Sequence, residues 1–443
     1  MTTHIPHVRT LSTALGVVLL GALLGCSSTD TSTTSDAVEL DFWYSVSGVP
    51  ATTLGTLVDE FNEDHAGEIV VKPLFQGSYD ESISKLTNAV QAGDLPVLIQ
   101  GGDTFSTYLK DTGLTAPPGS VTNSEGKKYS GTDLVPIIKN YYTFDGELSS
   151  YPIMVSQPAV IYNTELLTQA GIDPANAPTS ITELLSLAAQ IHSSSGTAGL
   201  TMFTDPWWAE QFSAAAGLEY CTPENGVGAE PAEKFNYASD TQVDIWQEIQ
   251  DLVRSGAMLN TGSDGTASLT AFSTGQAALM VQSSRIYGDV KAAANFDFGV
   301  WPFPVSSSNG GAVPGGSSVW IIKEGHSDQE LAAAASFGEF LASDAAQERI
   351  FAETGYLPTS LSALNSLSQS PATNAMQSVL LNQLENTPST TASAGCHTGA
   401  MGQARPLVKS ALEEIIGGGN PQTALRNAEE AGNKAIATYN ERR

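Results

Sequence analysis

Basic residues are scarce in this chain. Among its 443 residues, lysine and arginine number 19 against 47 aspartates and glutamates, so the formal net charge is −28. A surface this acidic repels phosphate backbones, and the sequence therefore argues against a nucleic-acid partner. It does not exclude a small anionic ligand, because one local cation can outweigh a diffuse field.

The familiar motifs of catalysis and cofactor binding are missing too. The sequence contains no Gly-x-Ser-x-Gly elbow, no His-Glu-x-x-His, no P-loop and no Cys-x-x-Cys, and its six histidines are scattered. We therefore expect no enzyme, no cofactor and no metal site. An extracellular carbohydrate-active enzyme with two catalytic carboxylates stays open as an alternative, although no acidic pair stands out by its context.

Cysteine occurs three times, and the first cysteine closes a targeting segment. An apolar run over residues 11–24, too short to span a bilayer, leads into Leu23-Leu24-Gly25-Cys26. This segment resembles a bacterial lipobox, which implies a lipoprotein signal peptide over residues 1–25 and a lipid on Cys26; the alternative is an ordinary signal peptide. A Ser/Thr-rich stretch over residues 26–37 reads as a disordered tether. We expect the folded part to be extracytoplasmic, anchored to the outer face of the cell membrane.

The other two cysteines, Cys221 and Cys396, lie in turn-rich segments. In an oxidising extracellular space, two remaining cysteines favour a disulfide. Two unrelated free thiols are the alternative.

Strand and helix patterns alternate along the chain, which predicts an α/β fold. Apolar runs over 38–46, 68–75 and 96–102 indicate strands, and helical spacing over 52–64 and 82–92 indicates helices. The third strand ends in two glycines, whose amides lie at the carboxyl end of a sheet, where open α/β sheets bind ligands. Further helices are predicted over 180–192, 241–255, 329–341, 345–353, 404–417 and 420–439, and further strands over 296–305 and up to residue 322.

Three short segments interrupt strong elements with polar, glycine or proline residues, around 153–157, 310–317 and 355–360. They are too short for flexible linkers, so we interpret them as three strands of a hinge between two lobes. Ser156-Gln157-Pro158 would then be one crossing. The predicted lobes are residues 38–154 with 317–356, and residues 155–316 with 357–443.

Eight segments along the whole mature chain form a recognisable series: "FWYSVSG" (42–48), "LVDEFNEDH" (57–65), "FQGSYDESISKL" (75–86), "SQPAVIYN" (156–163), "AFSTGQAALMVQSS" (271–284), "GGSSVW" (315–320), "TGYLPTS" (354–360) and "GAMGQARPLV" (399–408). With these segments the chain resembles the solute-binding proteins of ABC importers, in the branch that contains maltose- and glycerol-3-phosphate-binding proteins. The resemblance implies a two-lobed, periplasmic-binding-protein-like clamshell that holds a small polar solute in its cleft and delivers it to ABC permease subunits. We expect the protein to act as a monomer.

The pattern is most similar to binders of glycerol-3-phosphate and glycerophosphodiesters, with di- and oligosaccharides as the alternative ligands. At most one ring of the Trp207-Trp208 pair should face the cleft, and Tyr44 is a further candidate. The residues that the resemblance implies in the pocket are Tyr79, Asp80, Ser156, Trp208, Ser284, Gly316, Tyr356 and Arg405.

Two positions depart from the family pattern. His397 stands where the family carries a second arginine, and Arg285 replaces a small residue. Either Arg285 and Arg405 together form a phosphate pocket, or the specificity has moved to a neutral sugar. Local roles are the alternatives for single residues: Arg405 as part of an ion pair, and Asp80 as the cap of the helix near Ser82.

Overall fold

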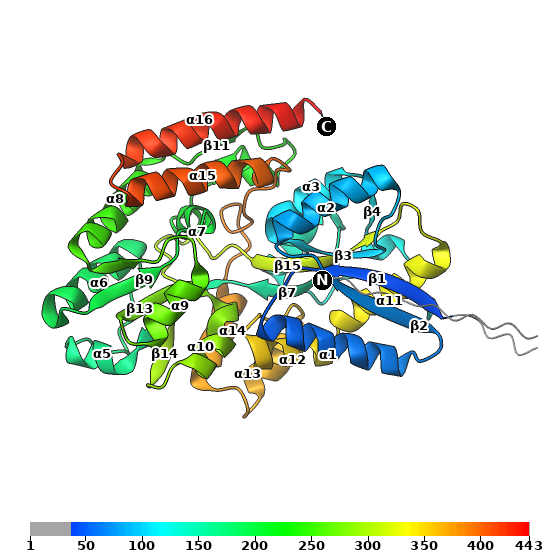
Figure 1. The fold of residues 1–443 in the computed structure, drawn as a ribbon, viewed down its shortest axis with the longest axis horizontal. Coiled ribbons are helices and arrows are strands. Elements are labelled where there is room, and N and C mark those ends of the chain that lie inside the picture. Colours follow the sequence, from blue (N-terminus) through cyan, green and yellow to red (C-terminus); the bar gives the residue numbers. More distant parts are fainter. Residues whose placement is uncertain (1–36, 443) are drawn as a thin grey trace, which may run out of the picture. The chain divides into compact units, whose positions relative to one another are not determined.

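The computed structural model describes residues 37–442. The predicted signal peptide, the lipid site at Cys26 and almost all of the predicted tether lie outside the described residues. The described chain forms two large β-sheets, each with helices packed against it, and two small two-stranded sheets. The predicted two-lobed α/β fold is therefore confirmed (Figure 1). None of the described helices is long and apolar enough to cross a membrane.

We call the first sheet and its helices lobe 1. Its strand order is β2-β1-β3-β15-β4. β4 pairs with the end of β15, at residues 321–322, and β7 pairs with residues 315–319 of the same strand. β1 runs parallel to β2 and β3, whereas β15 is antiparallel to β3. The strands are β1 (Val38–Tyr44), β2 (Ile69–Phe75), β3 (Leu98–Gly102), β4 (Thr115–Ala116), β7 (Tyr151–Ser156) and β15 (Gly315–Ile322). The helices are α1 (Val49–Asp64), α2 (Tyr79–Ala92), α3 (Ser106–Asp111), α11 (Asp328–Leu341) and α12 (Asp344–Thr354).

The second sheet and its helices form lobe 2. Its strand order is β12-β9-β13-β8-β14, with β12, β9 and β13 parallel and with β8 antiparallel to β13 and β14. The strands are β8 (Pro158–Asn163), β9 (Ala198–Met202), β12 (Met258–Asn260), β13 (Ala277–Ser283) and β14 (Phe298–Pro302). The helices are α5 (Thr164–Gln169), α6 (Ile181–Ser195), α7 (Trp207–Ala215), α8 (Asp240–Ser255), α9 (Gly265–Ser273), α10 (Tyr287–Ala293), α15 (Met401–Ile416) and α16 (Pro421–Asn440).

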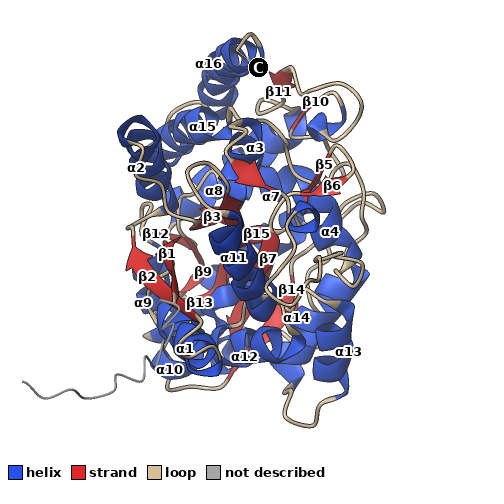
Figure 2. Ribbon diagram, turned by 90° about the vertical axis from the view of Figure 1, so that its right-hand side faces the viewer, coloured by secondary structure: helices blue, strands red, loops and turns tan. Residues whose placement is uncertain are grey.

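Smaller elements complete the described chain. Figure 2 shows the strands within the molecule and the helices largely around them. The remaining elements are α4 (Pro136–Tyr142), α13 (Leu361–Gln369) and α14 (Ala375–Asn386), the short strands β5 (Thr143–Phe144), β6 (Glu147–Leu148), β10 (Cys221–Thr222) and β11 (Lys234–Phe235), and the 3-10 turns η1 (Asp103–Phe105), η2 (Pro118–Ser120), η3 (Glu224–Gly226) and η4 (Ser284–Ile286).

The stretch Ser156-Gln157-Pro158 connects the two sheets. β7 ends in the lobe 1 sheet at Ser156 and β8 begins in the lobe 2 sheet at Pro158, so the proline takes the first position of a strand, where it is tolerated. The Gln157 side chain is fully buried, and its Nε2 donates to the carbonyl oxygen of Ala312, at 3.2 Å, in the loop that leads from β14 to β15. The backbone N–H of Leu357, after α12, donates to the Val155 carbonyl oxygen at 2.7 Å. The three connecting segments are therefore hydrogen-bonded to one another.

The start of α2 corrects one expectation. The helix begins at Tyr79, three residues before the predicted Ser82, and its cap is Ser78 rather than Asp80. The Ser78 side chain accepts the N–H of Glu81, and the Glu81 carboxylate accepts the N–H of Ser78, which satisfies two otherwise unpaired donors. Asp80 lies exposed in the first turn, where a negative charge suits the helix dipole.

Cys221 and Cys396 are joined by a disulfide with a Cα–Cα distance of 5.6 Å. Cys221 opens β10, and Cys396 lies in the loop before α15. The bond links residues 175 positions apart, so it closes a long loop.

Replacing both cysteines by serine should lower the free energy of unfolding by about 4 kcal/mol or less, because the open loop gains entropy in the unfolded chain. Guanidinium unfolding of the variant and of the wild-type protein measures the difference. Equal midpoints, together with reactive thiols at both positions in the unfolded, non-reduced wild-type protein, would contradict the expectation.

Candidate functional site

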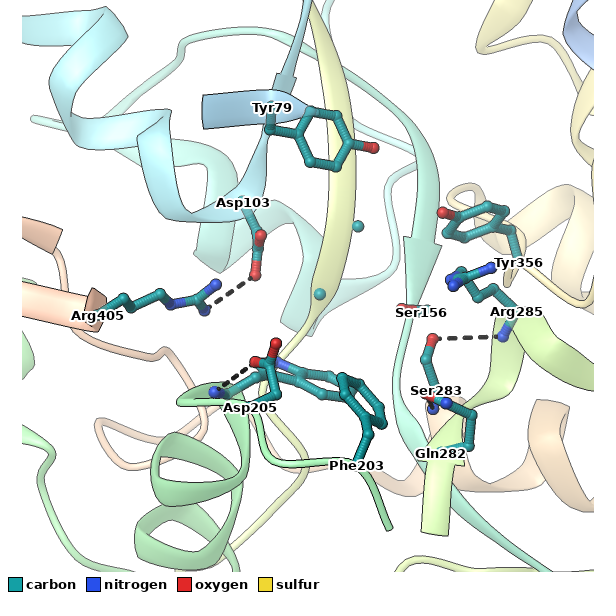
Figure 3. A pocket seen from close by; sticks show the side chains of 13 residues that line it. Tyr79, Asp103, Ser156, Phe203, Asp205, Gln282, Ser283, Arg285, Tyr356 and Arg405 are labelled. Carbon is teal, nitrogen blue, oxygen red and sulfur yellow. Dashed lines mark hydrogen bonds and ion pairs between the residues drawn. The ribbon is translucent and has the colours of Figure 1, made fainter. Parts of the chain in front are cut away.

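A cavity of about 180 Å³ lies between the two lobes (Figure 3). Both lobes contribute side chains to it, as the predicted cleft requires. The lining residues are Tyr79, Asp103, Ser156, Phe203, Asp205, Trp207, Gln282, Ser283, Arg285, Gly315, Gly316, Tyr356 and Arg405.

Strand ends position most of the polar groups in this cavity. Asp103 follows β3 directly, Asp205 follows β9 after two residues, and Ser283 ends β13. The carboxyl ends of parallel strands lie at one edge of a sheet, which is where open α/β sheets bind ligands. The cavity therefore collects the polar ends of strands from both sheets.

One wall of the cavity is rich in carboxylates and holds Arg405. The Arg405 Nε donates to Glu210 Oε1 at 2.7 Å, and its Nη2 donates to Glu210 Oε2 at 2.9 Å. Nη2 also lies 3.5 Å from Asp103 Oδ2, across the cleft in lobe 1. Asp205 accepts the backbone N–H of Trp207 at 2.9 Å. The arginine predicted to hold phosphate is thus already paired in two-point fashion with a buried glutamate.

Burial shapes the protonation of this wall. It raises the pKa of Glu210 and of Asp205, and Arg405 opposes both shifts. Burial alone would lower the pKa of Arg405, but Glu210 and Asp103 more than offset this effect, so the pKa of Arg405 lies above its ordinary value. The guanidinium therefore stays charged, and its charge is compensated by protein groups.

Arg285 supplies the opposite wall. It lies in η4, directly after β13, and is half-buried. No carboxylate of residues 37–442 forms an ion pair with it. Figure 3 shows Arg285 beside Tyr356, on the far side of the cavity from Arg405. Burial raises the pKa of Tyr356, so its hydroxyl keeps its proton and can donate to a ligand.

The aromatic ring from α7 that reaches the cavity belongs to Trp207, not to the predicted Trp208. Trp208 is fully buried, and its Nε1 donates to the Phe203 carbonyl oxygen at 2.8 Å. The buried Nε1 of Trp207 has no hydrogen-bond partner among the described residues. Tyr44 is absent from the lining and packs instead against Phe75, with ring centroids 5.5 Å apart.

Five of the eight predicted residues line the cavity: Tyr79, Ser156, Gly316, Tyr356 and Arg405. Asp80 lines an adjoining cavity instead. Ser283 lines the cavity in place of the predicted Ser284. The hydroxyl of Ser284 accepts the backbone N–H of Gln157 at 3.4 Å.

Gly316 lines the cavity wall, but the backbone also requires a glycine at this position. Its φ is 105°, and a Cβ at this position would lie 2.0 Å from the Met154 carbonyl oxygen. A side chain is therefore excluded whether or not a ligand is bound.

Sequence reasoning missed Asp103, Phe203, Asp205, Gln282, Ser283 and Gly315. A usable signal existed for Asp103, because it follows the buried strand that ends in two glycines. The strand before Asp205, Ala198–Met202, was not predicted, so nothing pointed to that carboxylate.

His397 does not replace the missing arginine. It is buried against the rings of Tyr141 and Phe144, and its Nε2 lies 3.2 Å from the Ala394 carbonyl oxygen. Burial lowers the pKa of His397 to about 4, so the ring is neutral near pH 7. The cationic side chains of the cavity lining are therefore Arg285 and Arg405.

Comparison with known proteins decides the family. The profile described as "Bacterial extracellular solute-binding protein" matches residues 56–377. The chain belongs to this family. As predicted, its relatives are binding proteins and not enzymes, which removes the carbohydrate-active enzyme as an alternative.

Curated relatives cover nearly the whole chain. The sn-glycerol-3-phosphate-binding periplasmic protein UgpB of Rhizobium meliloti (strain 1021) is 29% identical over 410 residues, which cover 90% of this chain and 94% of the relative. UgpB of Salmonella paratyphi A (strain ATCC 9150 / SARB42) is 26% identical over 438 residues, with 96% and 97% coverage.

Solved structures share the fold of this solute-binding protein. The GacH receptor of Streptomyces glaucescens, solved unliganded and with acarbose, has a TM-score of 0.75 at 23% identity and covers 91% of this chain and 99% of its own. UgpB of Mycobacterium tuberculosis, in complex with glycerophosphocholine, has a TM-score of 0.72 at 20% identity, with 92% and 99% coverage.

The buried His397 should make the protein less stable in acid. Its folded-state pKa lies below that of the unfolded chain, so the unfolded chain binds the proton first as the pH falls. Stability should decline from about pH 6.5, and at about pH 4 this one group should cost about 3 kcal/mol. Urea unfolding of the wild-type protein and of His397→Gln over this range measures the difference. Parallel pH dependence in the two proteins would contradict the expectation.

Proposed function

We propose that this solute-binding protein captures a glycerophosphodiester, a polyol with one phosphate charge, and delivers it to an ABC permease. The observation that carries the proposal concerns Arg285, the one cation of the cavity lining that no carboxylate of the described residues compensates; it lies on the wall opposite Asp103 and Asp205. A phosphodiester has one negative charge for Arg285. Its glycerol hydroxyls can donate to the two carboxylates.

Two kinds of comparison support this ligand class. Curated relatives are named for sn-glycerol-3-phosphate, and the M. tuberculosis protein of the same fold was solved with glycerophosphocholine. The cavity favours the diester over the monoester, because a monoester carries a second charge and Arg405 is already paired with Glu210.

A neutral di- or oligosaccharide is the second candidate. The rings of Tyr79, Phe203, Trp207 and Tyr356 offer apolar faces for a sugar, and the carboxylates can accept its hydroxyls. For such a ligand Arg285 would contribute little, which separates the two candidates by experiment.

We further propose that the protein acts as a monomer on the outer face of the membrane, held by a lipid on Cys26, and that the lobes close on the ligand about the three connecting segments. The lipobox-like sequence supports the anchor. The hydrogen-bonded segments around Gln157 support a shared hinge, because hinge bending concentrates at a few residues between elements.

Arg285→Ala should weaken the binding of glycerophosphocholine by about 2–5 kcal/mol, because the phosphate loses its charged partner. Arg285→Lys should restore the affinity in part, since an ammonium group cannot form the planar two-point contact. Calorimetry measures both variants, with Arg349→Ala as a control; Arg349 pairs with Glu60 and is not part of the cavity lining. Wild-type affinity of Arg285→Ala for glycerophosphocholine would argue against the phosphodiester, and maltose binding that also survives would favour the sugar.

Cys26→Ser should leave an unprocessed precursor or release the protein into the medium, because the sulfur that accepts the lipid is gone. Membrane fractionation and metabolic labelling with a fatty acid measure the outcome. Normal lipid labelling of the variant would refute the anchor.

A further inference from the structure

Glu210 lies behind the wall of the ligand cavity. It is on α7, which is buried along its whole length, and only 5% of the residue is exposed. It is not among the residues that line the cavity. Both of its carboxylate oxygens accept hydrogen bonds from Arg405, which does line the cavity.

The carboxylate of Glu210 compensates the positive charge of Arg405, but it does not occupy all the N–H donors of the guanidinium. The bonds to Glu210 use Nε and Nη2, and Nη1 has no hydrogen-bond partner among the described residues. Arg405 can therefore still donate a hydrogen bond to a ligand. It brings no net positive charge, because Glu210 compensates the guanidinium at contact distance and Asp103 lies 3.5 Å from it.

The charges at the cavity can be counted in the described chain. Arg285 and Arg405 are cationic, and Asp103, Asp205 and Glu210 carry carboxyl groups. Burial raises the pKa of Glu210 to about 7, and its two-point contact with Arg405 favours the charged form, so above pH 7 two positive groups face three negative groups. His397 is buried and neutral, and Lys409 lines only the adjoining cavity. A second negative charge on a ligand would enter a site with no cation left for it, and the repulsion is weakly screened in a partly buried cavity.

We propose that Glu210 is a specificity-determining residue: by neutralising Arg405 from behind the wall, it makes the cavity reject doubly charged phosphate monoesters in favour of singly charged phosphodiesters. This inference rests on the proposed function and adds the element that sets the ligand charge. Specificity is a difference of affinities, and a built-in repulsive element is one way to create it. Glu210 acts through Arg405 and touches no ligand itself.

The decisive variant is Glu210→Gln, which keeps the shape of the side chain and one acceptor for Arg405 but removes the negative charge. We expect the affinity for glycerol-3-phosphate, relative to glycerophosphoglycerol, to rise by at least about tenfold over the wild-type ratio. Glycerophosphoglycerol is a singly charged diester without the choline cation of glycerophosphocholine, which would itself respond to the lost carboxylate. Glu210→Asp, which keeps the charge, should restore the wild-type ratio. Glu60→Gln is the matched control, since it breaks a glutamate–arginine pair outside the cavity lining, with Glu60 Oε1 2.6 Å from Arg349 Nη1.

Calorimetry with the two phosphate esters distinguishes the outcomes. An unchanged ratio in Glu210→Gln, in a wild-type background that binds glycerophosphoglycerol, overturns the role of Glu210 and leaves the proposed function standing. If the wild-type protein binds neither ester, the proposed function fails, and inorganic sulfate then decides the role of Glu210. Sulfate keeps two negative charges across neutral pH. Sulfate binding at least about tenfold tighter in Glu210→Gln supports the role, whereas equal sulfate affinities overturn it.

A double variant covers the case in which Glu210→Gln does not fold. Glu210→Gln with Arg405→Gln removes both members of the pair, which leaves no buried unpaired charge and keeps the net charge of the site. The wild-type ratio of ester affinities in this variant supports the proposal. Loss of glycerophosphoglycerol binding overturns it, because Arg405 would then be a direct phosphate anchor.

Discussion

Three short connecting segments are hydrogen-bonded to one another between the lobes, and the rest of the site depends on them. Gln157 is the single residue between two strands that belong to different sheets, and its buried amide binds the second segment at Ala312. Leu357 binds the first segment at Val155. Because the segments are short and mutually bonded, they hold the two sheets next to each other. The strand ends of both lobes therefore face one small cavity.

One of the two arginines in that cavity is neutralised by a protein carboxylate and is not left free to attract an anionic ligand. Arg405, the most obvious anion anchor in the sequence, is paired with a buried glutamate, and a buried charge without a partner would be costly. Arg285 remains for the ligand, because no carboxylate of the described chain pairs with it. Among the described residues, the cavity lining thus has one cation without a paired carboxylate, Arg285, and two carboxylates, Asp103 and Asp205. This arrangement suits the proposed ligand, a polyol with a single negative charge.

Much of the fold could be predicted from the sequence, because it rests on local patterns. The helices over Val49–Asp64 and Asp240–Ser255 show clear apolar periodicity. The crossing at Ser156-Gln157-Pro158 can be recognised because these residues interrupt an apolar stretch. The strand Ala198–Met202 was missed, since a run of five residues that contains a glycine resembles many loops.

The site was harder to predict, and the errors have physical reasons. The sequence analysis predicts Trp208 and Ser284 in the pocket, whereas their neighbours Trp207 and Ser283 line the cavity. Sequence does not show which of two adjacent side chains faces a cavity. The pairing of Arg405 with Glu210 joins positions 195 residues apart and leaves no local trace. His397 stands where the family pattern has an arginine, and only its burial in the structure shows that it brings no charge to the site.

We infer that Arg285, and not Arg405, receives the negative charge of the ligand. A crystal structure of the protein with glycerophosphocholine is the decisive experiment. We expect phosphate oxygens within hydrogen-bond distance of the Arg285 guanidinium, with the Arg405–Glu210 pair intact. Phosphate bound to Arg405, with Glu210 displaced from it, would show that Arg285 does not have this role.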